Sequence, residues 1–263
     1  MKTTVYWFSG TGNSLYVAKS LSKSILNCEL KSIAREINTS KLICNSEKIG
    51  FIFPLYALGM PEIVIKFIKK LDFSNNVYIF GIVTRGANSW GGLDQLDALL
   101  KQKSKLLSAG FYIDMPGNFI IKHRLSYEDK QQQLFRNAES KIDEISSIVN
   151  TNGNKIEKSH IFFRLYARIY HMVWLKFLNS FYTKFYSDEN CNSCGMCIDI
   201  CPVHNIKLEN GKPVWNNNCQ LCLSCLHFCP KASIQYGKNT KEKLRYHHPK
   251  ISAEEMIRQK FHK

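Results

Sequence analysis

The chain has 263 residues, a length that suits one α/β domain and a smaller second domain. Its 36 lysines and arginines outnumber its 21 acidic residues, which gives a formal net charge of +15. No apolar run is long enough to span a bilayer and no secretory leader is recognisable, so we expect a cytoplasmic protein without a transmembrane segment.

Short apolar runs alternate with helical patterns over residues 1–116. Runs rich in β-branched and aromatic residues predict five strands, at 3–8, 28–33, 48–53, 76–83 and 109–114. Helical patterns fall between them, near residues 14–27, 61–71 and 91–107. This alternation predicts a doubly wound, five-stranded parallel sheet covered on both faces. Ligands of such sheets bind beyond the carboxyl ends of the strands.

The loop after the first strand has the composition of an anion site. It reads Ser9-Gly10-Thr11-Gly12-Asn13-Ser14 and leads directly into a helix. Glycines let the backbone curl, so that amides and hydroxyls point inward in front of the helix N-terminus. The loop lacks the Gly-Lys-Ser/Thr of a Walker A motif, and Leu15 breaks the G-x-G-x-x-G of a Rossmann fingerprint.

Residues 5–21 resemble the phosphate loop of flavodoxins through Ser9, Thr11, Gly12, Asn13, Ser14 and Ala18. The family commonly has threonine at the position of Ser14, which keeps the hydroxyl. Two further loops, 54–61 and 84–92, resemble the two flavin loops of that family, with Tyr56 and Trp90 as candidates to flank the isoalloxazine ring. The resemblance implies FMN, bound by Ser9, Gly10, Thr11, Gly12, Asn13, Ser14, Pro54, Tyr56, Ala57, Gly59, Thr84, Arg85, Gly86, Trp90 and Gly91. Another nucleotide in the same fold is the alternative.

Residues 117–187 form a helical linker that belongs to neither domain pattern. Ser126-x-x-Asp129 predicts a capped helix running to about residue 149. A second helical segment, 158–186, is rich in Phe and Tyr and is interrupted by Arg and Lys. We expect it to pack between the two domains. The alternatives are an interfacial membrane helix, which also combines basic and aromatic residues, and a groove for a partner.

Eight of the ten cysteines form one spaced pattern written twice. Cys191-x-x-Cys194-x-x-Cys197-x-x-x-Cys201-Pro202 recurs 28 positions later as Cys219-x-x-Cys222-x-x-Cys225-x-x-x-Cys229-Pro230. In bacterial two-cluster iron–sulfur proteins the fourth cysteine of each such run ligates the other cluster. The pattern therefore predicts two [4Fe–4S] clusters, one on Cys191, Cys194, Cys197 and Cys229, the other on Cys219, Cys222, Cys225 and Cys201. Zinc knuckles and disulfides fit this spacing poorly.

Residues 188–237 resemble a two-cluster bacterial ferredoxin, and Asn210-Gly211 predicts a hairpin between the two runs. Because so small a module has little hydrophobic core, we expect metal binding to supply much of its folding free energy.

Residues 238–263 form a basic tail, in which Ser252-x-x-Glu255 predicts a capped helix. We expect His247 and His248 to lie on the surface.

The order of these modules resembles the bacterial flavodoxin–ferredoxin fusion proteins of anaerobes. The resemblance implies an electron-transfer protein that relays electrons between FMN, two [4Fe–4S] clusters and external redox partners. The alternative is an FMN-dependent reductase of a small organic acceptor fed through its own clusters. The flavin loops contain no paired acid and base, so no catalytic residue is predicted.

The basic charge bears on partners. Two oxidised clusters with their thiolates and one FMN phosphate would add about six negative charges, leaving roughly +9. A basic surface favours acidic redox proteins, such as a ferredoxin, a flavodoxin or an oxidoreductase. No nucleic-acid-binding motif accompanies the charge, so nucleic acid is not expected as a partner. Peripheral contact with an anionic membrane is a further alternative.

Overall fold

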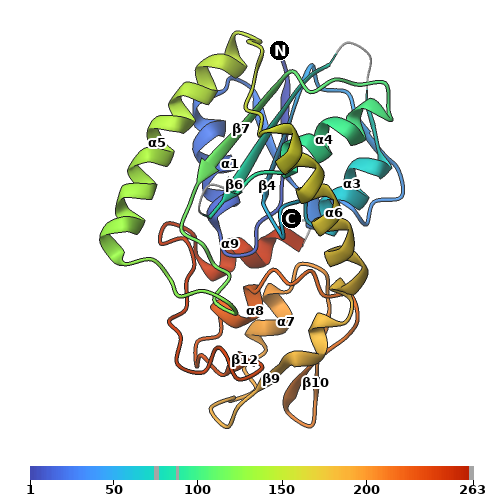
Figure 1. Cartoon of the computed structure of the whole chain (residues 1–263). Coiled ribbons are helices and arrows are strands. Elements are labelled where there is room, and N and C mark those ends of the chain that lie inside the picture. The colour runs from blue at the N-terminus through green and yellow to red at the C-terminus, as the bar shows by residue number, and fades with distance from the viewer. Residues whose placement is uncertain (74–76, 87–88, 261–263) are drawn as a thin grey trace.

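The computed structural model describes residues 1–73, 77–86 and 89–260. Within them a parallel six-stranded sheet forms the centre of the larger domain (Figure 1). Its spatial order is β2 (Cys28–Ser32), β1 (Thr3–Trp7), β4 (Lys48–Pro54), β6 (Tyr78–Arg85), β7 (Ala109–Asp114) and β8 (Lys155–Ile156). Without β8 this is the flavodoxin-like order 2-1-3-4-5.

The five strands expected from the sequence all form, and the doubly wound α/β fold is confirmed. Residue 76, expected at the start of the fourth strand, lies outside the described residues. The sixth strand, β8, was not expected, because two residues are too few to show a strand period.

Helices cover both faces of the sheet, because side chains on each strand alternate between the faces. On β1, Val5 and Trp7 join one core, and Tyr6 joins the other. The first core is closed by α1 (Asn13–Ser24) and α5 (Glu128–Asn150), and the second by α3 (Glu62–Lys70) and α4 (Gly92–Lys101). A short parallel pair, β3 (Leu42–Cys44) with β5 (Leu71–Phe73), and α2 (Ile33–Glu36) complete this part. We call residues 1–156 the sheet domain.

The second lobe, residues 185–237, lies at the carboxyl edge of the sheet and is called the cluster lobe (Figure 1). Its strands form two antiparallel pairs, β9 (Phe185–Ser187) with β12 (Ile234–Tyr236) and β10 (Ile206–Glu209) with β11 (Lys212–Trp215). The expected hairpin joins β10 to β11, with Asn210 at φ 49° and Gly211 at φ 74°. Two short helices, α7 (Met196–Ile200) and α8 (Ser224–His227), carry cysteines from the two runs.

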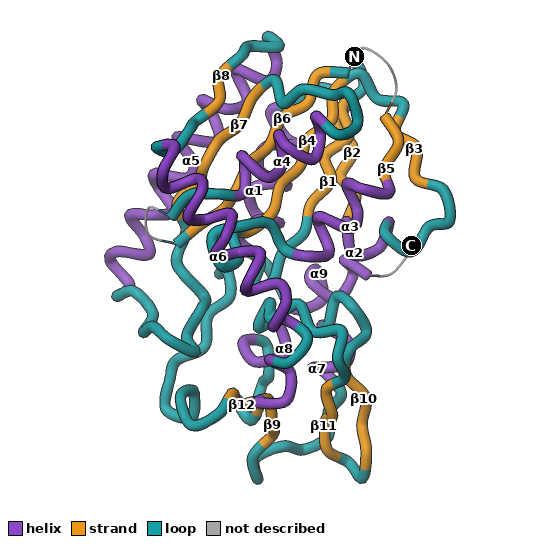
Figure 2. Tube along the Cα trace, turned by 45° about the vertical axis from the view of Figure 1, so that its right-hand side comes forward, coloured by secondary structure: helices purple, strands orange, loops and turns teal. Residues whose placement is uncertain are grey.

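The aromatic helix α6 (Ile161–Leu178) is shorter than the expected segment 158–186. A 3-10 turn, η1 (Phe181–Lys184), follows it, and β9 begins at Phe185, three residues before the boundary expected at 188. The expectation that this helix packs between the two domains was wrong for most of its surface. It runs along the outside of the molecule, from the sheet domain to the cluster lobe (Figures 1 and 2), and only one stripe of it is buried.

The tail returns to the junction of the two lobes, where α9 (Ala253–Ile257) and η2 (Arg258–Lys260) lie (Figure 2). The capping box at Ser252 and Glu255 is confirmed. The one predicted at Ser126 was wrong, since α5 begins after Tyr127 without a side-chain cap. No helix among the described residues is both long and apolar enough to cross a membrane.

Candidate functional site

The first loop curls in front of α1. Gly12 takes a left-handed φ of 95°, and its amide donates to Ser9 Oγ at 3.0 Å. Within the described residues, the amides of Thr11, Asn13 and Ser14 have no backbone acceptor, and the first turn of α1 contains no acidic residue. Amides at the positive end of a helix dipole favour a bound anion.

This loop forms one wall of a pocket at the carboxyl edge of the sheet, with about 360 Å³ of space that is partly open to solvent. The pocket is lined by Ser9, Gly10, Thr11, Asn13, Ser14, Pro54, Leu55, Tyr56, Thr84, Arg85, Gly86, Pro116, Gly117 and Asn118. Hydroxyl, amide and guanidinium groups predominate among its polar side chains, and no carboxylate of the described residues lines it. This set of donors fits the phosphate and polar edges of a flavin nucleotide.

Five residues expected at the cofactor lie outside this pocket: Gly12, Ala57, Gly59, Trp90 and Gly91. Two further residues of the third loop, 87 and 88, lie outside the described residues.

Trp90 packs on Arg85, whose guanidinium lies 4.5 Å from the Trp90 ring centroid and 4.6 Å from that of Tyr112. Arg85 also donates to Asp114 at 2.6 Å. Trp90 therefore lies outside the pocket, where it packs against Arg85 and supports that residue of the pocket wall.

Gly59 closes a tight turn with Tyr56, each amide donating to the other's carbonyl at 2.9 Å. His171 of α6 lies on this turn, with Nδ1 3.2 Å from the Ala57 carbonyl oxygen. A Cβ at Gly59 would lie 2.3 Å from His171 Cγ, so the close contact requires glycine there. α6 therefore holds the second loop in place from outside.

Sequence reasoning missed a fourth loop, Pro116 to Asn118, that follows β7 and lines the pocket. Asn118 Nδ2 donates to Thr11 Oγ1 at 3.0 Å, and Asn13 Nδ2 donates to the Pro116 carbonyl at 3.0 Å. The signal was present in the fold class, because every loop after a parallel strand ends at this edge.

The tail also reaches the first loop, which the sequence did not indicate. The His248 amide donates to the Thr11 carbonyl at 2.8 Å, and the Tyr246 hydroxyl donates to Asn13 Oδ1 at 2.6 Å. The His248 ring stacks on Tyr16, with centroids 4.0 Å apart, and burial lowers its pKa to about 4. The expectation that His248 is on the surface was wrong, whereas His247 is exposed. We call residues 245–251 the tail strap.

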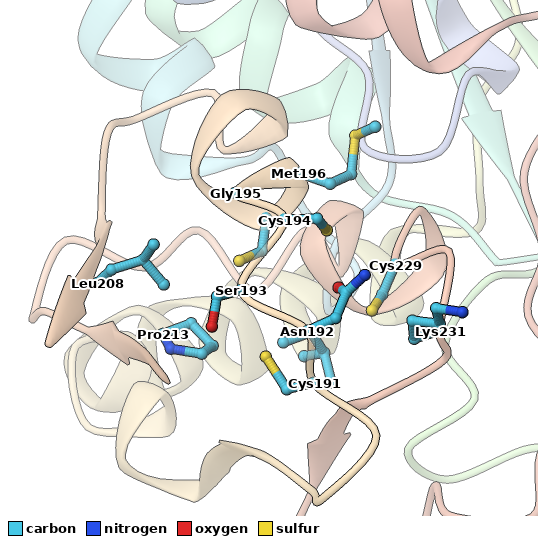
Figure 3. A pocket seen from close by; sticks show the side chains of 12 residues that line it. Cys191, Asn192, Ser193, Cys194, Gly195, Met196, Leu208, Pro213, Cys229 and Lys231 are labelled. Carbon is cyan, nitrogen blue, oxygen red and sulfur yellow. The ribbon is translucent and has the colours of Figure 1, made fainter. Parts of the chain in front are cut away.

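The first predicted ligand set meets in one pocket of the cluster lobe, with about 320 Å³ of space that includes open solvent. Cys191, Cys194, Cys197 and Cys229 line it, so the second run supplies one thiol to the first, and Figure 3 labels three of the four. Cys194 is exposed and Cys191 half-buried. Burial, with the neighbouring Cys229 and Cys191, raises the pKa of Cys197 to about 11, so a cationic iron centre would have to stabilise its thiolate.

The second predicted set, Cys201, Cys219, Cys222 and Cys225, is buried throughout. Burial, with the nearby thiols of Cys222 and Cys201, raises the pKa of Cys219 to about 12. Backbone amides already face two of the sulfurs: Asn205 donates to Cys201 Sγ and Leu221 to Cys219 Sγ, each at 3.3 Å. Amides aimed at sulfur stabilise the thiolates of a bound cluster.

Among the described residues, no three His, Cys, Asp or Glu side chains converge on a point that would hold a single metal ion. A [4Fe–4S] cube is larger and holds its four thiolates farther apart, as ligands of different irons. Each of the two cysteine groups offers four soft thiol donors, and this donor chemistry suits an iron–sulfur cluster.

The buried cysteine set touches the pocket of the sheet domain directly. Ser224 Oγ lies 3.2 Å from Cys222 Sγ and donates to the Gly10 carbonyl at 2.6 Å. A Cβ on Gly10 would lie 2.6 Å from the Cys222 carbonyl oxygen and 2.6 Å from Tyr56 Oη. Among the described residues the Tyr56 hydroxyl is buried without a hydrogen-bond partner, and burial, with the nearby Cys222 and Cys219 thiols, keeps its pKa well above the usual value. An orphaned donor beside these sulfurs fits a bound cluster.

Residues 185–207 match the family described as 4Fe-4S binding domain. This stretch is an iron–sulfur binding segment. It contains β9 and the first cysteine run, and the second run lies beyond the matched residues. No curated protein matches the chain.

Three solved structures share a distant likeness with this chain. An azoreductase from Bacillus anthracis str. Sterne is 9% identical, with a TM-score of 0.40 over 57% of this chain and 100% of its own. An FMN-dependent NADH-azoreductase from Bacillus anthracis str. Ames Ancestor, in complex with FMN, is 10% identical with the same score and coverage. Rubredoxin oxygen:oxidoreductase from Desulfovibrio gigas is 12% identical, with a TM-score of 0.35 over 57% of this chain and 36% of its own. The fold assignment rests on strand order and register, not on these likenesses.

Proposed function

We propose that this chain is an electron-transfer protein that binds FMN in the sheet domain and two [4Fe–4S] clusters in the cluster lobe. Such clusters pass single electrons, and FMN exchanges one or two. The observation that carries the proposal is the contact of Gly10 in the pocket loop with Cys222 in the buried cysteine set. The two candidate sites share this wall, so the protein holds them at a fixed, short separation.

The two cysteine sets differ in access, and the difference suggests their order. The set with Cys201 is buried against the flavin pocket, whereas the set with Cys229 includes the exposed Cys194. We infer that the outer set exchanges electrons with external partners and that the inner set faces the flavin. Tyr56 lies between the inner set and the pocket, where its buried hydroxyl excludes water and is available as a donor.

The first test is the cofactor content of protein purified without oxygen. We expect about eight irons and eight sulfides per chain, together with one FMN released on denaturation. The pocket favours FMN over FAD because the terminal phosphate fits the α1 N-terminus. Zinc in place of iron, or release of FAD or of no flavin, would refute the corresponding part of the proposal.

The second test separates a relay from two independent cofactors. Rapid mixing with a limiting amount of reductant should show reduced clusters reoxidised as the flavin is reduced, at a rate that does not change when the protein is diluted. The fixed contact at Gly10 is the physical reason, because both sites belong to one molecule. A rate that falls in proportion to protein concentration would mean transfer between molecules, and the relay would be rejected.

A further inference from the structure

The outer face of α6 is strongly apolar. Of the 17 exposed large hydrophobic side chains among the described residues, nine lie on this one helix. Phe162 is 76% exposed, Leu165 59% and Ile169 54%. They recur at spacings of three and four residues, so they form one continuous stripe along the helix. At about 1.5 Å per residue, the 18 residues of α6 give a stripe about 27 Å long.

The opposite stripe anchors the helix to the sheet domain. Ala167 and His171 are buried, and His171 contacts the Ala57 carbonyl. Arg164 forms an ion pair with Asp94 of α4 at 2.8 Å. The outward orientation of the apolar stripe is therefore set by packing, and the helix cannot rotate to bury it without breaking these contacts.

The charged residues of the helical segment itself are of one sign, and one of them, Arg164, is paired with Asp94 of α4. Residues 158–186 contain five lysines and arginines and no acidic residue. Arg168 and Lys176 are exposed, and Lys176 lies on the line of the stripe itself, in the last turn of α6. At about 100° per residue, Arg168 lies at one edge of the apolar stripe, and Tyr166 and Tyr170 lie toward the other. Arginine and tyrosine at the borders of an apolar face place polar tips at the level of lipid headgroups.

We propose that α6 binds the surface of an anionic lipid bilayer, with its apolar stripe at the level of the acyl chains and Arg168 and Lys176 against lipid phosphates. A second copy of the chain is a poorer occupant, because two such helices would bring Arg168 and Lys176 of both copies together, and residues 158–186 contain no acid to neutralise them.

The test is vesicle flotation of the anaerobically purified holoprotein. We expect it to float with vesicles of phosphatidylglycerol and phosphatidylcholine, and to bind pure phosphatidylcholine vesicles at least several-fold more weakly. Phe162→Ser with Ile169→Ser should weaken binding to the anionic vesicles by more than roughly tenfold, because two side chains no longer enter the bilayer. Arg168→Gln with Lys176→Gln should remove the preference for anionic lipid.

The matched control is Leu26→Ser with Leu106→Ser, which removes two exposed leucines, 87% and 68% exposed, that do not belong to α6. This variant should float like the unmodified protein. Absence of vesicle binding, or equal loss in the α6 and control variants, overturns the proposal. A third outcome would also overturn the proposal. If the α6 variant lost self-association or binding to an acidic protein but still bound vesicles, the face would serve a protein partner.

Discussion

At the scale of single residues, Gly10 shows how closely the two lobes approach. The Cys222 carbonyl oxygen and Tyr56 Oη each lie 2.6 Å from the place where a Cβ would stand. Neither neighbour withdraws without cost, since one is backbone and the other is the buried hydroxyl of a half-buried ring. A glycine that the sequence indicates for phosphate binding thus also permits the contact with the inner cysteine set.

Gly10→Ala should therefore destabilise the protein by about 1–3 kcal/mol, the usual cost of overpacking a tight interior. The control is Gly117→Ala on another wall of the same pocket, where a Cβ would meet none of the described residues within 4 Å. That variant should stay within about 0.5 kcal/mol of the unmodified protein. Anaerobic urea unfolding of both measures the difference, and equal destabilisation would contradict the contact.

His248 carries a pH dependence. Its ring is buried between Tyr16 and Phe135, its Nε2 has no hydrogen-bond partner in the part of the chain that the structure describes, and burial lowers its pKa to about 4. The unfolded chain takes up the proton near pH 6.5, so the stability contributed by the neutral ring is present above that pH. It is lost progressively as pH falls from about 6.5 towards 4.

The free energy of unfolding should accordingly fall by about 1 kcal/mol between pH 7 and 5.5 through this residue. His248→Phe, which keeps a ring against Tyr16 but cannot titrate, should lack this component. Acid sensitivity of the clusters affects both proteins alike, so the difference between their pH profiles isolates His248. Superimposable profiles would exclude its contribution.

At the scale of elements, the two cysteine runs interlock. Cys201 ends α7 and yet lies with the thiols of the second run, and Cys229 follows α8 and lies with those of the first. Each run therefore stabilises the site of the other, and the hairpin between β10 and β11 sets the chain length available for the crossing.

Cys201→Ala should damage the inner cluster more than the outer one, with loss of up to about four irons per chain. Iron analysis and low-temperature EPR of the reduced protein measure which cluster remains. Cys28→Ala, which removes a half-buried thiol outside both runs, should keep the full iron content. Selective loss of the outer cluster in the Cys201 variant would reverse the assignment.

At the scale of the whole molecule, three segments distant in sequence hold the lobes together. The inner cysteine loop contacts the first pocket loop, Gln220 accepts from the Ile63 amide at 2.9 Å, and the tail strap covers the α1 N-terminus. Lys19 pairs with Glu255 of α9 across the same junction. The chain has a formal net charge of +15, and it would remain basic if the proposed cofactors added about six negative charges.

Reduction by an acidic ferredoxin should therefore slow severalfold to about tenfold as ionic strength rises from about 0.01 to 0.15 M, because the screening length shrinks from about 30 to 8 Å. Stopped-flow rates at several salt concentrations test this. A neutral small-molecule reductant is the control and should show little salt dependence. The same weak dependence with the ferredoxin would argue against electrostatic docking.

The sequence alone determined the five main strands and the doubly wound parallel sheet of the larger domain. It also predicted the anion-binding loop and the two cysteine sets. Each of these follows from local physics: alternation of strands and helices, glycines before a helix, or fixed spacing around a ligand. Tertiary structure alone decided the rest. The sequence around Trp90 does not predict that its ring packs against Arg85, and the sequence of the tail does not predict that His248 stacks on Tyr16. The outward-facing stripe of α6 and the contact of Gly10 with Cys222 both depend on packing between segments far apart in the chain. Burial of apolar surface, and not local propensity, selects these arrangements.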